Sequence, residues 1–236
     1  MTGRGAAGDP PSLCAQGAHR RAGRLRPMDN VIQLVTVYAI PVLFAITLHE
    51  AAHGYVARMF GDNTAFVAGR ISLNPIRHID PIGTVVVPLV MVALSGFMFG
   101  WAKPVPVDFG SLRRPKQDMI WVAGAGPGAN LVMAIGWVLF AKLLALFGVQ
   151  EDYFFLVANA GVQVNLVFMA LNLIPIPPLD GGRIAVGLLP HRLAYQYAKL
   201  EPYGMFIIIA LLVTGALNVL LRPFLQMGES IVRLFM

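Results

Sequence analysis

Apolar and charged positions along this chain separate into long blocks instead of alternating. Five stretches contain no Asp, Glu, Lys or Arg, namely residues 31–48, 81–102, 119–141, 153–179 and 203–221. A helix needs about 20 apolar residues to cross the hydrocarbon core of a bilayer. The blocks therefore predict a chain that crosses a membrane several times, and they leave little length for a soluble domain.

Breaker residues divide these blocks into elements. Gly61-Asp62-Asn63 stops the first helix, and a Pro-rich segment from Pro175 to Pro178 stops the third. We expect four spanning helices, at residues 29–60, 117–149, 153–173 and 205–221.

The segments between the predicted helices differ in character. Residues 66–73 combine β-branched and aromatic residues, which favours a strand or hairpin arm at the membrane surface. Residues 184–200 are weakly amphipathic and are expected at the interface, whereas 81–100 is apolar and just long enough to cross. The predicted fold class is an all-α polytopic membrane protein with four spanning helices, a re-entrant segment and a small membrane-associated β-element.

Composition supports a membrane protein and excludes several other classes. Hydrophobic residues make up 57% of the 236-residue chain and charged residues 13%, about half the usual charged share of a soluble domain. A single Cys excludes a disulfide framework and a thiolate zinc site. The net charge of +6 resides mainly in a tail, residues 1–27, which holds five Arg and one Asp. Nucleic-acid binding is therefore not predicted.

Three regions follow from these patterns. Residues 1–27 are rich in Pro, Gly and Ala without a hydrophobic period, which indicates a disordered tail or a mis-assigned start. Because Met28 immediately precedes the first apolar run, translation is expected to begin there, with residues 1–27 dispensable. Residues 28–221 form the predicted membrane core, and 222–236 an amphipathic C-terminal segment.

The strongest chemical motif is His49-Glu50-Ala51-Ala52-His53, an HExxH pattern. Side chains at positions i and i+4 share one face of a helix, so both imidazoles can bind one metal ion. Glu50 lies beside them, where it can accept a proton from water at the metal. Ionisable groups in a membrane helix are costly and are functional by default.

Two His leave a zinc site short of a third protein ligand, for which Asp180 is the candidate. It lies in a segment that runs from Asn172 through three prolines to Gly181-Gly182. Unwound backbone is tolerated at membrane depth only where it lines protein or a wet cavity, so this carboxylate can reach a metal. The other interpretation is that Asp180 caps the following helix.

Together, three motifs resemble those of the site-2 protease family, zinc metalloproteases that cut inside membranes. The first motif is HExxH. The second is Gly-x-Gly-Pro-x-x-Asn, which runs from Gly124 to Asn130 within a predicted helix. The third is Asn-x-x-Pro-x-x-x-Leu-Asp-Gly, from Asn172 to Gly181. The resemblance implies that His49, His53 and Asp180 bind one Zn²⁺ per chain and that Glu50 is the catalytic acid/base. It implies that Asn172 stabilises the substrate carbonyl or oxyanion.

The resemblance covers residues from about 30 to 200. Within the family, the chain is similar to a compact bacterial form without PDZ or CBS modules. It implies a transmembrane protein or peptide as substrate, the lipid bilayer as surroundings and a bacterial plasma membrane as location. The sequence does not fix the oligomeric state.

Other interpretations remain open at this point. A divalent-cation transporter would also place His and Asp at mid-membrane, and a catalytically silent membrane-binding homologue is a third class. Gly124 and Gly128 are interpreted as a small-residue packing face. His78 is interpreted as an interfacial residue, with a second metal contact or a gate as alternatives.

Charge in the short loops predicts the topology. The loops 61–80 and 101–118 and the segment 181–200 carry Lys and Arg, whereas the turn at 150–152 has Glu151 and Asp152 and no positive residue. Positive short loops favour the cytoplasm, so the turn is expected outside and the active site toward the cytoplasmic half.

Overall fold

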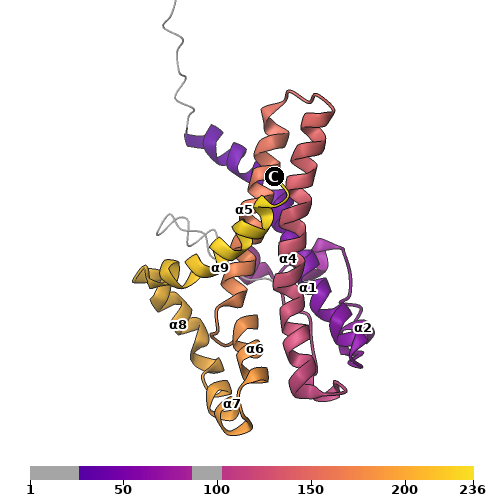
Figure 1. Cartoon of the computed structure of the whole chain (residues 1–236), viewed down its shortest axis with the longest axis vertical. Helices are drawn as coiled ribbons and strands as arrows, with labels where there is room; N and C mark the ends of the chain where they lie inside the picture. The colour runs from indigo at the N-terminus through magenta and orange to yellow at the C-terminus, as the bar shows by residue number, and fades with distance from the viewer. Residues whose placement is uncertain (1–26, 87–102) are drawn as a thin grey trace, which may run out of the picture.

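The protein is all-helical in the part of the chain described by the computed structural model, residues 27–86 and 103–236 (Figure 1). The predicted tail up to residue 26 and residues 87–100 of the predicted re-entrant segment lie outside this part. The helices are, in order, α1 (Pro27–Met59), α2 (Thr64–Val67), α4 (Pro115–Leu146), α5 (Asp152–Leu173), α6 (Asp180–Leu188), α7 (His191–Ala198), α8 (Glu201–Val213) and α9 (Ala216–Arg233). Short turns of 3₁₀- or π-helix occur at η1 (Pro75–His78), η2 (Pro81–Val86) and η3 (Phe109–Ser111).

Four stretches of the described chain are long and apolar enough to cross a membrane: Val35–Met59, Pro115–Leu146, Asp152–Leu173 and His191–Val213. The first three match the predicted helices. Their outward side chains include exposed Val132, Leu139 and Val167, which suit contact with lipid. The chain is therefore an integral membrane protein by the length and composition of its helices.

The fourth predicted helix, 205–221, is not one helix. It is interrupted after Val213, where the Thr214 hydroxyl donates back to the Ala210 carbonyl and Gly215 takes a left-handed φ of 75°. Only glycine adopts that conformation without strain, so α8 ends and α9 begins in a new direction. The apolar stretch that includes α8 starts at His191, within the segment predicted for the interface.

The predicted β-element at 66–73 is not confirmed, because the described residues contain no strand. Phe66 and Val67 belong to α2, and an irregular loop follows. The buried Asp62 carboxylate accepts hydrogen bonds from the Thr64 backbone N–H and hydroxyl, which starts a helical turn. Gly69 has a left-handed φ of 63°, which is incompatible with a continuous strand across residues 66–73.

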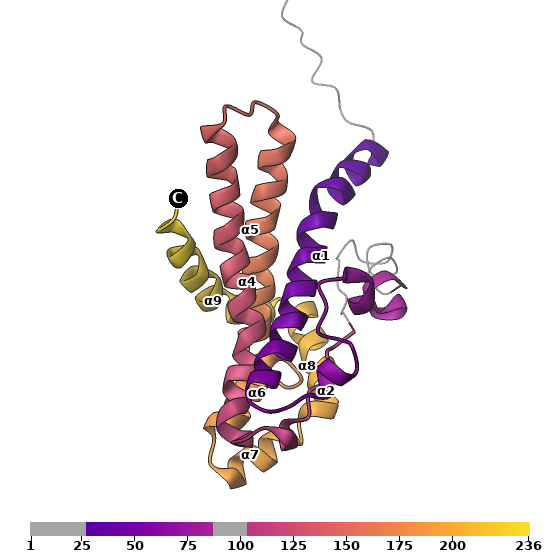
Figure 2. The same cartoon turned by 90° about the vertical axis from the view of Figure 1, so that its right-hand side faces the viewer.

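Helices α1, α4 and α5 pack side by side as the centre of the molecule, with α6 against α4 and α9 against α5 (Figure 2). One apolar cluster joins α4, α5 and α9 through buried Ala134, Leu166 and Val232. The start of α1 and the α4–α5 turn lie at one end of the bundle, and the start of α4, with α6 and α7, lies at the other (Figure 2). This arrangement brings the second half of α1 beside the first half of α4.

Candidate metal centre

His49 and His53 lie one turn apart on α1 and turn the same face toward α4. Both are buried, and their Nε2 atoms lie 3.1 Å apart. Such closeness follows from the i, i+4 spacing, which stacks two side chains on one helix face.

Asp180 completes a triangle with these two imidazoles. It is the first residue of α6, and its Oδ2 lies 3.3 Å from each Nε2. This oxygen is buried and has hydrogen-bond geometry to no described residue. Among the described residues, His49, His53 and Asp180 are the one group of His, Cys, Asp or Glu whose ligand atoms converge in this way.

Two glycines explain how α6 reaches the triangle. A Cβ added at Gly181 would lie 2.3 Å from the Leu173 carbonyl oxygen, and one at Gly182 would lie 2.5 Å from the Pro177 nitrogen. Both distances are far below contact, so only glycine lets the first turn of α6 fold back against the end of α5. This packing carries Asp180 into the bundle. The capping interpretation is wrong, because the N-cap of α6 is Leu179 and no side chain caps this helix, whereas Oδ2 of Asp180 faces the two imidazoles.

The donor and acceptor pattern of the triangle fits a cation. His53 Nδ1 lies 2.7 Å from the Val122 carbonyl oxygen and His49 Nδ1 lies 2.6 Å from Asn130 Oδ1. Both partners accept, so each Nδ1 carries the proton and each Nε2 presents a lone pair. Two lone pairs and a carboxylate oxygen then face one another, an arrangement that a bound cation satisfies.

The spacing of the triangle also suits zinc. Zinc bonds of about 2.0–2.1 Å directed to the corners of a tetrahedron place those corners about 3.3–3.4 Å apart. The three edges measured here are 3.1, 3.3 and 3.3 Å. Imidazole and carboxylate are also the donors that zinc takes in catalytic sites with three protein ligands.

Gly126 on α4 makes room for this triangle. A Cβ at Gly126 would lie 2.4 Å from His53 Nε2 and 2.5 Å from His49 Cε1. A Cβ at Gly124 or Gly128 would meet nothing within 4 Å among the described residues. No described residue packs on Gly124 or Gly128, so the packing face stays a prediction, and Gly126 is the glycine in close contact.

Glu50 is held by a loop that crosses α1. Its Oε2 accepts a 2.7 Å hydrogen bond from the Val105 backbone N–H. Val105 stands between Pro104 and Pro106, which have no N–H, so it supplies the only backbone donor of that tripeptide.

Three further hydrogen bonds anchor the same loop. The Lys103 N–H donates to the His78 carbonyl, Arg70 Nη2 donates to the Lys103 carbonyl, and the Asp108 N–H donates to Asp62 Oδ2. The loop therefore connects Glu50 to the segment that follows α1.

Two other predicted residues lie outside the triangle. Asn172 is half-buried near the end of α5, and its amide donates to the Phe168 carbonyl of its own helix. His78 is 1% exposed and bonds through Nε2 to the Ser72 carbonyl, so it is buried within the protein and lies outside the group of converging ligands.

The sequence motifs did not reveal the role of two buried asparagines. Asn130 contacts His49, and Asn165 contacts Asn130. Asn130 belongs to the quoted Gly-Pro-x-x-Asn motif, but its partner there is not evident from spacing. The only signal for Asn165 is an amide within an apolar run, which is costly in a membrane unless it is bonded.

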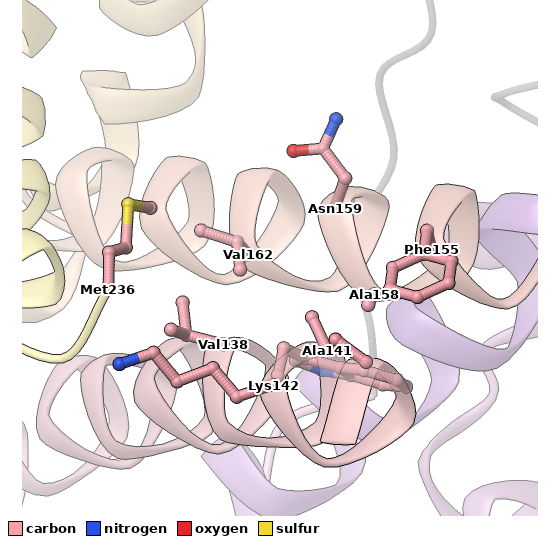
Figure 3. A pocket seen from close by; sticks show the side chains of 10 residues that line it. Val138, Ala141, Lys142, Phe155, Ala158, Asn159, Val162 and Met236 are labelled. Atoms are coloured by element: carbon pink, nitrogen blue, oxygen red, sulfur yellow. The ribbon is translucent and has the colours of Figure 1, made fainter. Parts of the chain in front are cut away.

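A separate groove lies between the C-terminal half of α4 and the N-terminal half of α5. Figure 3 shows Lys142, Asn159 and Met236 among the side chains that line it. None of the triangle residues lines this groove, so it is distinct from the candidate metal centre.

Comparison with known proteins relates most of the chain to peptidases. The model of peptidase family M50 matches residues 148–215. YwhC of Bacillus subtilis, whose name describes it as a candidate zinc metalloprotease, is 39% identical over 213 residues, which are 86% of this chain and 93% of the relative. Rip2 of Mycolicibacterium smegmatis, described in the same terms, is 32% identical over 203 residues, 84% of this chain and 74% of the relative. No solved structure matches.

Proposed function

The chain belongs to peptidase family M50, the site-2 protease family, and from that membership we propose that it is an intramembrane zinc metalloprotease. It hydrolyses peptide bonds within or beside transmembrane segments of other membrane proteins. The observation that carries this proposal is the buried triangle of His49, His53 and Asp180, with Glu50 next to it in the sequence.

His49, His53 and Asp180 hold one Zn²⁺ per chain in this proposal. Zinc in a site with three protein ligands acts as a Lewis acid that polarises a carbonyl and lowers the pKa of water to about 7. The Val122 carbonyl and Asn130 keep both imidazoles in the tautomer that presents Nε2. Burial of the triangle excludes bulk water, which strengthens each electrostatic contact.

Glu50 is the proton carrier of the proposed reaction. Its carboxylate takes a proton from the attacking water and then delivers it to the amide nitrogen as the peptide bond breaks. The Val105 N–H orients this carboxylate. Asn172 is assigned to the substrate carbonyl by family resemblance. To act there, its amide must leave the Phe168 carbonyl, to which it donates in this structure.

The substrate must reach the triangle as an extended segment, because a helical peptide bond is shielded by its own turn. We place the enzyme in a bacterial plasma membrane with the triangle toward the cytoplasmic half. The basic loops at the α6–α7 end of the bundle support that orientation.

The test is Glu50→Gln, which keeps the shape of the side chain and removes its base. Cells carrying this variant are compared with wild type by proteomics of membrane-protein fragments. We expect the fragments generated by the wild type to disappear while zinc content stays at one per chain. Glu151→Gln, at the exposed start of α5, is the matched control and should leave the fragments unchanged.

Persistence of all fragments in Glu50→Gln cells would overturn the protease proposal. Metal flux that survives Glu50→Gln would favour the transporter, which needs ligands but no general base. Absence of zinc from the purified wild type would favour a catalytically silent homologue.

A further inference from the structure

Two polar but uncharged amide side chains are buried inside the helix bundle. Asn130 on α4 and Asn165 on α5 are both 0% exposed. Burial of an unpaired amide costs several kcal/mol in an apolar medium, so such groups persist where they are bonded and used. Their partners therefore indicate what they do.

The two side chains form one continuous chain of hydrogen bonds across three helices. Asn165 Nδ2 donates to the Gly161 carbonyl of α5 at 2.8 Å. Asn130 Nδ2 donates to Asn165 Oδ1 at 2.9 Å, and Asn130 Oδ1 lies 2.6 Å from His49 Nδ1. The chain thus starts at a backbone carbonyl of α5 and ends at an imidazole of the metal triangle.

The direction of every bond in this chain is fixed by the backbone. The Gly161 carbonyl can only accept, so the amide nitrogen of Asn165 must face it and its oxygen must face Asn130. The nitrogen of Asn130 then donates, with a second, 3.4 Å contact to the Ala45 carbonyl that has the same polarity. The oxygen of Asn130 is left for His49, which must donate from Nδ1.

The two imidazoles differ in how they are held. His53 Nδ1 bonds to the Val122 carbonyl of the α4 backbone, which no side-chain substitution removes. His49 depends entirely on Asn130, and the orientation of Asn130 depends on Asn165. The helices that carry this chain approach closely, because a Cβ at Gly161 would lie 2.3 Å from the Trp137 ring of α4.

We propose that Asn165 and Asn130 are positioning residues that lock the His49 ring with Nε2 toward the metal. The inference rests on the proposed metal centre and adds a second layer of residues to it. Partners that orient a metal-bound imidazole in this way typically contribute 10–100-fold in metal affinity. The lock also ties the metal centre to the packing of α5, which supplies none of the three ligand atoms.

The test measures the dissociation constant for Co²⁺, by its absorption spectrum, and the melting temperature of the metal-free full-length protein in detergent. Asn130→Leu should weaken Co²⁺ binding about 10–100-fold, because the His49 ring loses its acceptor. Asn130→Asp keeps an acceptor oxygen beside His49 and should bind Co²⁺ within about threefold of wild type. The same variant should lower the metal-free melting temperature, because its second oxygen faces Asn165 Oδ1.

The double variant Asn130→Leu with Asn165→Leu separates positioning from packing. Asn130→Leu alone leaves the buried Asn165 amide oxygen without its donor, which should lower metal-free stability. Replacement of both residues by apolar groups of similar shape removes this unpaired amide, so metal-free stability should return toward that of wild type. Co²⁺ binding should stay about 10–100-fold weak, because His49 still lacks its acceptor. Asn159→Leu, at an exposed position of the same helix as Asn165, is the control and should change neither quantity.

The opposite results are equally defined. Unchanged Co²⁺ affinity in Asn130→Leu, or equal loss in the Leu and Asp variants, would overturn the positioning role. Wild type that binds no Co²⁺ would overturn both this inference and the proposed function. Wild type that binds Co²⁺ and cleaves no membrane protein would overturn the proposed function alone.

Discussion

Asp180 is the residue through which α6 takes part in the metal centre, and its charge can be removed without a change of size. Asp180→Asn keeps the volume and removes the anion that zinc prefers. We expect activity to be lost and zinc to bind more weakly by at least the roughly 10–100-fold that loss of an outer partner of a ligand costs, with the helical content preserved. Metal analysis and circular dichroism measure both quantities.

Asp152→Asn is the matched control, because Asp152 is likewise the first residue of a helix but is exposed. It should leave zinc content and activity unchanged. Full zinc content in Asp180→Asn would instead mean that another residue completes the site, with His78 as the candidate to substitute next.

Gly126 provides a second test at the scale of one atom. Gly126→Ala places a methyl group 2.4 Å from His53 Nε2, so either the imidazoles or α4 must move. We expect zinc affinity to fall by at least about tenfold, because the lone pairs no longer converge. Isothermal titration of zinc into the metal-free protein measures this change.

Gly124→Ala and Gly128→Ala are the controls for that substitution. Both positions lie on the same helix and would meet nothing within 4 Å, so alanine should raise helix stability by up to about 1 kcal/mol per site. Equal zinc affinity in all three alanine variants would contradict the close-contact role of Gly126.

At the scale of whole elements, prediction from sequence succeeded where one long apolar run coincides with one helix. Helices α1, α4 and α5 match such runs, because length and lack of charge suffice to identify a spanning helix. The break between α8 and α9 was not predictable, since hydropathy carries no signal for the left-handed Gly215. The strand expected at 66–73 failed because the Asp62 side chain organises the following turn.

The candidate site was likewise predictable from the sequence only in part. His49, His53 and Asp180 were singled out by helical spacing and by motif, and the structure brings them together. The contact between Asn130 and Asn165 joins residues 35 positions apart on different helices. A single sequence contains the amides but not the packing of α4 on α5 that pairs them.

The Pro104-Val105-Pro106 segment is an element whose single donor can be removed. Val105→Pro deletes the N–H that binds Glu50, while the flanking prolines already restrict the backbone to extended conformations. A hydrogen bond to a charged group contributes about 1.5–3 kcal/mol, so we expect kcat to fall roughly 10–100-fold with zinc content unchanged.

Val105→Ala is the control for that element, because it shortens the side chain and keeps the N–H. Steady-state kinetics on a reconstituted membrane substrate distinguish the two variants. If Val105→Ala lowered kcat as much as Val105→Pro, packing of the side chain and not its N–H would be responsible.

The whole molecule has two ends of different charge, and this sets its expected orientation. The α4–α5 turn with Glu151 lies at one end, and the basic positions near α6 and α7 lie at the other (Figure 2). In a Cys14→Ser background, Glu151→Cys should react with an impermeant thiol reagent in intact cells. Arg192→Cys should react only after the membrane is opened. The reverse pattern would invert the proposed topology.

The triangle draws its ligands from α1 and α6, and α1 precedes α6 in the chain. Because a chain emerges from the ribosome with its N-terminal part first, the two imidazoles enter the membrane before Asp180 exists. A nascent chain that has formed only α1, α4 and α5 contains the proposed base without a complete metal centre. The metal centre is therefore completed only once α6 has joined α1, α4 and α5.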